Sequence, residues 1–446
     1  MRPILSTLVV FAALGCRAQP AAPQPPIDGS VADPPPPVAA VTPPPAAAPA
    51  PAPASTGTPV TLPVLDAMFA DAGFAAALKT SLDLTDDQIE RLRTGARAAT
   101  KALMKRGEGS SLASRHADEL IRGVVGDDKT GRLAEFVRDY WTRDEHGNPA
   151  APGAEPVPGG VPTDTRIVVN APAYRMDVFR DGALVDTYKI GIGYPEFPLP
   201  TGLRSASTII FNPTWTPPDE PWVTGDVKAG ERVAAGSKDN PLGAIKIPIG
   251  MPSLIHGGKA AANLGGFASH GCVGLTDAQV KTFAQVLAQI SETPLAPADV
   301  LAYEKDAKKT KRVALAATIP VELRYETIVV EAGKLRIYRD VYERGTNTEE
   351  NLQRVLEASG VRPSTLSDED RAHITTALRR MALAPDGSVV DPNAADEDAA
   401  ESDGAEVTRR IKGAKVVEIA IPALAGKGYP APHTRPRRGA GKPTWW

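Results

Sequence analysis

A tract rich in proline and alanine, residues 17–63, sets the first limit on what this chain can fold into. Proline fixes φ and has no backbone N–H, so a segment with runs such as residues 34–37 cannot build a packed core. We expect a semi-rigid, polyproline-II-like tether here, although a linker without a tuned length fits the same composition. The rest of the 446-residue chain is long enough for two or three domains.

Residues 1–16 have the pattern of a secretory leader. Arg2 supplies a positive charge, and the apolar run that follows is too short to span a bilayer as a helix. The run ends in small residues before Cys16, which resembles the lipidated first residue of a mature bacterial lipoprotein. We therefore expect a signal peptide and a lipid anchor at Cys16, on the periplasmic side of a membrane in the cell envelope. An ordinary cleaved signal, which gives a soluble periplasmic protein, and an uncleaved anchor stay open.

Helical periodicity follows the tract, over residues 64–146. A capping-box pattern begins at Thr85, and apolar residues recur after it at helical spacing. The region is either a docking domain for a partner or a small bundle that packs on its neighbour. A linker rich in proline and glycine, residues 147–164, separates it from the next domain.

From residue 165 the pattern changes to short apolar runs between turn residues, which favours a β-sandwich or a mixed sheet. Strong helical periodicity returns only in residues 277–290, where Val280, Phe283, Val286 and Leu287 share one face and Thr276 or Asp277 is the expected cap.

The fold class that we predict is α+β and multidomain. A β-rich, sandwich-like domain at 165–300 is flanked by the helical N-terminal domain and by a mixed C-terminal extension. We assign residues 301–345 as a β segment associated with the β-rich domain, and residues 346–446 as the extension. Its basic tail either touches an anionic polymer or lipid headgroups, or is a frayed terminus. The formal net charge of −3 gives no reason to expect a nucleic-acid partner.

Chemistry concentrates around Cys272, since the sequence has 2 cysteines and the other is Cys16. A thiol becomes a nucleophile when a nearby imidazole takes its proton, and His256 and His270 are both close in sequence. Glycine at position 271 suits a tight backbone path that exposes the sulfur and frees N–H groups for an oxyanion. The residues predict a cysteine nucleophile; a buried, unreactive cysteine is the alternative.

The segments Ile255-His256-Gly257-Gly258 and Ser269-His270-Gly271-Cys272-Val273-Gly274-Leu275 together resemble the active-site signature of the YkuD-type L,D-transpeptidases. Those enzymes cross-link bacterial peptidoglycan. The resemblance continues upstream, in family order, through residues 191–193, 200–202, 212–218 and 240–243.

This resemblance implies a role for each matching residue. Cys272 is the nucleophile, His256 is the proton donor and acceptor, and the carbonyl of Gly257 orients His256. The positions implied to shape the pocket are Ser269 and His270, and the implied oxyanion donors are the N–H groups of Gly271 and Cys272. Trp215, Gly258 and Gly274 are expected near the substrate.

The resemblance also implies an acyltransferase that needs neither a metal nor an organic cofactor. Its partners are peptidoglycan stem peptides, with a stem amine or the lysine of an envelope protein as acceptor. Water as acceptor would make it an L,D-carboxypeptidase or endopeptidase. A degenerate domain that only binds peptidoglycan is the third interpretation, and the retained cysteine and histidine argue against it.

Two positions depart from the family pattern. Gly274 stands where the family usually has arginine or, in some branches, asparagine, and Gly258 stands where it often has threonine. An arginine at position 274 would bring a fixed positive charge close to the acyl group. The residues that we consider as replacements for this charge are Arg204, Lys246 and Lys259.

Overall fold

The computed structural model describes residues 59–106, 109–143, 159–218, 223, 227–250, 253–389 and 410–433. All of them belong to one unit, residues 53–446. The expected leader with Cys16, most of the tether, most of the 147–164 linker and the end of the basic tail lie outside the described residues. Within the described ranges, no helix is long and apolar enough to cross a membrane.

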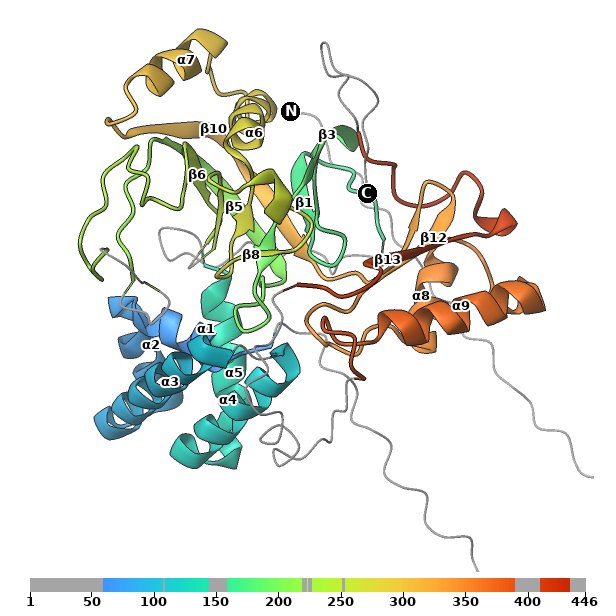
Figure 1. Ribbon diagram of the computed structural model, residues 1–446, viewed down its shortest axis with the longest axis horizontal. Coiled ribbons are helices and arrows are strands. Elements are labelled where there is room, and N and C mark those ends of the chain that lie inside the picture. The colour runs from blue at the N-terminus through green and yellow to red at the C-terminus, as the bar shows by residue number, and fades with distance from the viewer. Residues whose placement is uncertain are drawn as a thin grey trace, which may run out of the picture. The chain divides into compact units, whose positions relative to one another are not determined.

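The first part of the described chain is helical (Figure 1). Its helices pack around a core of their own that includes Phe74, Leu92, Ile121 and Val137. The predicted capping box is present, because Gln88 N–H donates to Thr85 Oγ1 at 3.2 Å and Thr85 N–H donates to Gln88 Oε1 at 3.0 Å. The helices are α1 (Leu62–Phe69), α2 (Ala72–Leu82), α3 (Asp86–Arg106), α4 (Ser110–Val125) and α5 (Asp127–Trp141).

An eight-stranded mixed sheet, the main sheet, follows in the order β3-β2-β1-β10-β5-β6-β7-β9. The pairs β1–β10 and β7–β9 are parallel, and the other neighbours are antiparallel. Its strands are β1 (Arg166–Asn170), β2 (Arg175–Arg180), β3 (Ala183–Lys189), β5 (Gly202–Phe211), β6 (Ile245–Pro248), β7 (Leu254–His256), β9 (Val273–Gly274) and β10 (Lys311–Arg324). A separate pair joins β4 (Ile192–Gly193) to β8 (Phe267–Ser269) in parallel.

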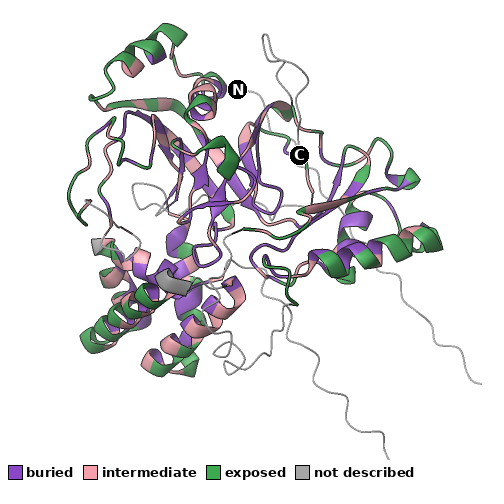
Figure 2. Cartoon of the chain, viewed as in Figure 1, coloured by how far each residue is buried: buried purple, intermediate pink, exposed green. Residues whose placement is uncertain are grey.

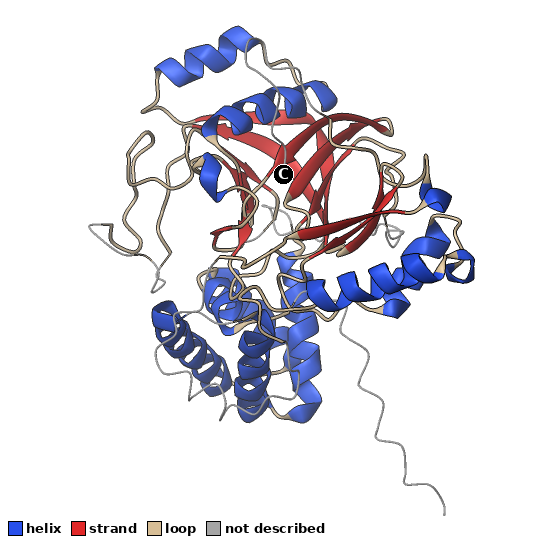
Figure 3. Ribbon diagram, turned by 45° about the vertical axis from the view of Figure 1, so that its right-hand side comes forward, coloured by secondary structure: helices blue, strands red, loops and turns tan. Residues whose placement is uncertain are grey.

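This architecture corrects the expectation of a sandwich. Figure 3 shows the strands as one curled sheet, and the second sheet of this region is only the short β4–β8 pair. Helix α6 (Asp277–Ile290) packs its apolar face, with Val280, Phe283 and Leu287, into the core of the main sheet. The cap of α6 is Thr276, which forms a capping box with Gln279. Helix α7 (Pro297–Lys305) and the 3₁₀ turn Ala261–Asn263 complete this region.

Strand β10 lies within the segment 301–345, which we predicted to be a β segment associated with the β-rich domain. It lies in the middle of the main sheet, between β1 and β5, and its buried residues Val321 and Leu323 enter the common core. The segment 301–345 is therefore divided between two sheets. The sequence pattern of a strand states only which face is apolar; it does not name the neighbours with which the strand pairs.

The C-terminal region is a second, smaller α/β layer with its own core. Its antiparallel sheet has the order β11-β12-β13, and the helices α8 and α9 pack on this sheet. Figure 2 shows their outer sides exposed and their inner sides buried. The elements are β11 (Ile328–Glu331), β12 (Lys334–Tyr338), β13 (Val416–Ala420), α8 (Glu349–Ala358), α9 (Asp368–Met381) and the 3₁₀ turns Pro363–Thr365 and Pro422–Leu424.

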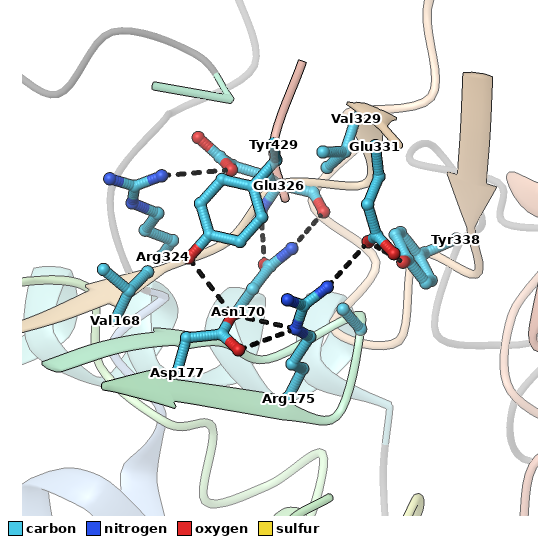
Figure 4. Close-up of a pocket in the computed structure, with 11 residues that line it drawn as sticks. Val168, Asn170, Arg175, Asp177, Arg324, Glu326, Val329, Glu331, Tyr338 and Tyr429 are labelled. Carbon is cyan, nitrogen blue, oxygen red and sulfur yellow. Dashed lines mark hydrogen bonds and ion pairs between the residues drawn. The ribbon is translucent and has the colours of Figure 1, made fainter. Parts of the chain in front are cut away.

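A buried ion-pair cluster joins this small sheet to the main sheet (Figure 4). Arg175 of β2 contacts Asp177 at 2.8 Å and Glu331 of β11 at 3.0 Å. Tyr429 donates from its hydroxyl to Asp177 at 3.1 Å, and Arg324 of β10 lies beside its ring. Since every charge in the core of this cluster has an opposite charge or a hydrogen bond, we interpret the cluster as a structural joint between the two sheets.

Candidate active site

The pairing of β7 with β9 brings together two segments of the predicted motif. β7 ends at His256, and β9 begins directly after Cys272. In their parallel register Ile255 faces Val273 and His256 faces Gly274. Because β9 is the edge strand of the main sheet, the turn that carries Cys272 lies at the sheet margin, two residues before the glycine that pairs with His256.

The imidazole of His256 is buried and held in one orientation. Its Nδ1 lies 2.7 Å from the carbonyl oxygen of Gly257, the contact that the resemblance implies. A carbonyl oxygen only accepts, so Nδ1 carries the proton and Nε2 is the basic nitrogen of the neutral ring. Burial lowers the pKa of His256 to about 3, and the nearby charge of Lys259 acts in the same direction. The ring is therefore neutral near pH 7, as a general base must be.

The turn before Cys272 is fixed by serine hydroxyls. Ser269 Oγ donates to the carbonyl of Cys272 at 2.6 Å and accepts from its N–H at 3.1 Å. Ser253, which sequence reasoning missed, donates to the carbonyl of Gly271 at 2.9 Å. Gly271 has a φ of 88°, a conformation that favours glycine.

These contacts distinguish the two expected oxyanion donors. The N–H of Cys272 is engaged by Ser269, so in this structure it does not point at an open site. The N–H of Gly271 donates to no backbone carbonyl in the part of the chain that the structure describes. Of the two, Gly271 is thus the one that remains suited to meet a developing oxyanion.

Charge around the thiol comes from two lysines. Burial raises the pKa of Cys272; a backbone hydrogen bond from Leu254 and the charges of Lys259 and Lys246 oppose this shift. Lys246 lies on β6 directly opposite His256. The thiol therefore needs these opposing groups to reach its reactive, deprotonated form.

His270 is packed between two aromatic rings. The ring of Tyr194 lies 5.1 Å from it and that of Phe197 lies 4.8 Å from it, both edge to face. The backbone of the same loop is held by hydroxyl groups of the helical region, because Thr61 donates to the carbonyl of Glu196 at 2.6 Å and Ser110 donates to that of Pro195 at 2.5 Å. These contacts give His270 a packing role next to Cys272.

Asp277 was considered from sequence only as a possible cap of α6, and the structure gives its carboxylate a different role. Its Oδ1 accepts from the N–H groups of Ala244 and Gly258, each at 2.9 Å. The first turn of α6 thus ties down the loop that follows His256. Gly258 has a φ of 75°, and a Cβ there would lie 2.6 Å from the carbonyl oxygen of Pro241. Close packing of two loops explains this glycine.

The upstream landmarks shape the loop between β5 and β6. Asn212 donates from its amide to the carbonyls of Tyr303, Asp306 and Lys309, at 2.8 to 3.2 Å. Asn240 donates to the carbonyl of Pro213 at 2.8 Å. Trp215 is half-buried and forms a backbone bridge with Val233. A contact between Trp215 and a substrate stays a prediction. Among the described residues, no group of three or more His, Cys, Asp or Glu is placed to hold a metal ion.

Comparison with known families gives a match to part of the chain. Residues 164–312 match the YkuD family, the L,D-transpeptidase catalytic domain. This match begins just before β1 and ends within β10, so it covers most of the main sheet, the histidine and the cysteine described above.

Individual relatives resemble only part of the chain. Over 135 residues it is 33% identical to the probable L,D-transpeptidase YcfS of Escherichia coli strain K12, a match that covers 27% of this chain and 40% of that protein. The catalytic domain of an E. faecium L,D-transpeptidase matches with 18% identity and a TM-score of 0.24, over 37% of this chain and 100% of that one. An L,D-transpeptidase from Mycobacterium smegmatis matches with 15% identity and a TM-score of 0.23, over 36% of this chain and 58% of that one.

Proposed function

We propose that this protein is a peptidoglycan L,D-transpeptidase of the bacterial cell envelope, with Cys272 as nucleophile and His256 as general base and acid. The observation that carries the proposal is the hydrogen bond between His256 Nδ1 and the carbonyl of Gly257. It leaves Nε2 as the basic atom of a neutral ring, on the strand that pairs with the start of β9, next to Cys272. The family match over residues 164–312 supports the reaction class.

In the first half-reaction the thiolate of Cys272 attacks the carbonyl carbon of the third residue of a tetrapeptide stem. The thiol proton passes to Nε2 of His256. The negative charge that develops on the carbonyl oxygen is met by the N–H of Gly271, and losing such a donor typically costs about 3–4 kcal/mol of barrier. The C–N bond to D-alanine then breaks, and His256 returns its proton to the departing amine. A thioester on Cys272 remains.

In the second half-reaction an amine attacks the thioester carbonyl and gives up a proton to His256, which returns it to the sulfur of Cys272. A stem amine as acceptor produces a 3→3 cross-link, and the lysine of an envelope protein attaches that protein to the wall. A water molecule as acceptor makes the enzyme an L,D-carboxypeptidase. The preserved hydrogen bonds of His256, Ser269 and Cys272 favour an active enzyme over a degenerate peptidoglycan-binding domain.

The proposal includes a lipid anchor at Cys16, which would hold the enzyme at a membrane on the periplasmic side. Export follows from the leader pattern of residues 1–16 and from the place of the substrate outside the cytoplasm. The part of residues 17–63 that precedes Val60 would then act as the tether between the anchor and the helical region, because Val60 and Leu62 already belong to the helical core.

The test is intact-mass analysis of the full chain mixed with a disaccharide-tetrapeptide, with Cys272→Ala as the matched control. We expect a thioester adduct that depends on Cys272 and the release of D-alanine. Dimeric products then identify a transpeptidase, whereas tripeptide alone identifies a carboxypeptidase. Binding of the muropeptide without adduct or turnover would overturn the proposal in favour of a binding domain.

A further inference from the structure

The hydrogen-bonded side chains of the site, those of His256, Ser269 and Cys272, carry no permanent positive charge. His256 is a neutral imidazole near pH 7, and burial raises the pKa of the Cys272 thiol. A buried thiolate without a cation beside it is costly, because leaving water penalises the charged form. The pair of His256 and Cys272 therefore needs a nearby cation to stabilise the thiolate, and the structure shows a candidate.

Lys259 reaches into the corner between β7 and β9. Its backbone N–H donates to the carbonyl of Leu275 at 3.0 Å, so the residue is fastened to the end of β9. Its side chain then runs across Gly274. A Cβ built on Gly274 would lie 2.8 Å from Lys259 Cγ, 3.4 Å from Cδ and 3.2 Å from Cε. The approach to Cγ is closer than carbon atoms adopt and the approach to Cε is tight, so the lysine stem occupies the space of a side chain at position 274.

The register of the two strands places this stem at the reacting groups. Gly274 lies opposite His256, and Cys272 is two residues before it on the same chain segment. The charge of Lys259 acts on both neighbours, since it lowers the pKa of His256 and that of Cys272, and the thiolate in turn opposes the lowering of the lysine pKa by burial.

We propose that Lys259 is a positioning residue which supplies the positive charge of this active site, stabilising Cys272 as the thiolate, and that position 274 is glycine because Lys259 fills its side-chain space. The presence of Lys259 and the absence of a side chain at position 274 are then linked, because the cation comes from the loop after His256 and not from the strand after Cys272. The inference rests on the proposed function only for the identity of Cys272 as nucleophile.

Other charged groups near the thiol play smaller or different parts. Lys246 approaches from β6 and contributes less than Lys259 to the field at Cys272. Asp277, at the start of α6, directs Oδ1 at the backbone N–H groups of Ala244 and Gly258. Arg204, which we considered from sequence, is fully buried on β5 opposite Val321 and does not enter the field acting on Cys272.

The test measures the reactivity of Cys272 directly, without turnover. The full chain and its Lys259→Met variant are alkylated with iodoacetamide from pH 5 to 10, and the peptide that contains Cys272 is quantified by mass spectrometry. We expect the apparent thiol pKa to rise by about one unit or more in Lys259→Met, which lowers the alkylation rate near pH 7 by about tenfold. Lys281→Met, on the exposed side of α6, should leave the profile unchanged.

A second pair of variants separates charge from packing. Lys259→Arg keeps the charge and should retain most of the low-pH reactivity. The exchange Lys259→Ala with Gly274→Arg moves the cation to the other segment and should recover reactivity that Lys259→Ala alone loses. An unshifted profile in Lys259→Met, with a circular dichroism spectrum like that of the parent, would overturn the inference. Absence of transpeptidation by the parent chain would refute the proposed function, whereas the effect of Lys259 on the alkylation of Cys272 would still hold.

Discussion

The hydroxyl of Tyr342 donates to the carbonyl of Gly193 at 2.9 Å and accepts from the N–H of Leu199 at 3.1 Å. Tyr342 lies after β12, beyond the segment that matches the YkuD family, yet its side chain is buried in the core of the main sheet. Gly193 in turn packs on the catalytic turn, since a Cβ there would lie 3.1 Å from Gly271 N. Tyr342 of the C-terminal region thus holds Gly193, which packs against the turn that precedes Cys272.

Removing this hydroxyl should weaken both the fold and the site. Tyr342→Phe leaves a buried carbonyl and a buried N–H without their partner, which we expect to cost about 1–3 kcal/mol of unfolding free energy. Acylation of Cys272 should slow because the support of Gly271 loosens. Urea denaturation and adduct formation measure the two effects. Tyr303→Phe, whose ring packs on Phe211 at 5.1 Å, is the control, and an equal loss in both variants would contradict the assignment.

Asp277 should matter through its position and not through chemistry. Asp277→Ala removes the acceptor of two backbone N–H groups, and we expect a loss of roughly 1–3 kcal/mol together with slower alkylation of Cys272. Asp277→Asn keeps an acceptor oxygen and should behave closer to the parent. Asp299→Ala, which removes a similar contact at the start of α7, should lower stability without changing alkylation. If Cys272 is alkylated at the same rate in Asp277→Ala and Asp299→Ala, Asp277 does not position the site.

The neutral state of His256 predicts a stability that falls in acid. The unfolded chain binds a proton on this histidine near the ordinary histidine pKa of 6.5, whereas burial in the folded chain lowers that pKa to about 3. Folding therefore excludes one proton in that window, and stability should fall by up to about 1.4 kcal/mol per pH unit as the pH drops through it. Stability curves of the parent and His256→Gln should converge as the pH falls from 6.5 to 3. His373→Gln, at an exposed position, is the control, and its curve of unfolding free energy against pH should run parallel to that of the parent. Parallel curves for the parent and both variants would contradict the prediction.

The ion-pair joint between the two sheets should be sensitive to the loss of one partner. Arg175→Met leaves Asp177 and Glu331 buried without their cation, for which we expect roughly 3–5 kcal/mol of destabilisation in urea. Arg180→Met on the same strand removes only an exposed contact of 3.9 Å with Asp181 and should cost less than about 1 kcal/mol. Similar midpoints for the two variants would show that the cluster does not hold the sheets together.

Some of this architecture follows from local patterns. Helix α6 has the apolar face that its periodicity predicts, and its cap is Thr276, one of the two residues expected there, because both features depend on residues within one or two turns of each other. The contact between His256 and the Gly257 carbonyl is local in the same sense, since the two residues are adjacent. Helix α3 begins directly after Thr85, where the capping-box pattern places a helix start.

Other parts depend on pairing between distant segments. The sequence pattern of β10 does not show that it inserts between β1 and β5, and this is why the expected sandwich differs from the structure. Tyr342 reaches Gly193 across 149 positions of the chain. No local spacing predicts such a contact, because strand pairing and burial are decided by the whole core.

The sequence by itself determined the chemical groups of the site: a cysteine outside the expected leader, histidines at a recognisable spacing, and a glycine where an arginine was expected. Only the tertiary structure decided which cation lies beside that glycine. Three basic residues were candidates, and the parallel register of β7 and β9 brings the stem of Lys259 over Gly274. Side-chain direction across paired strands is a property of the assembled sheet, so no single segment encodes it.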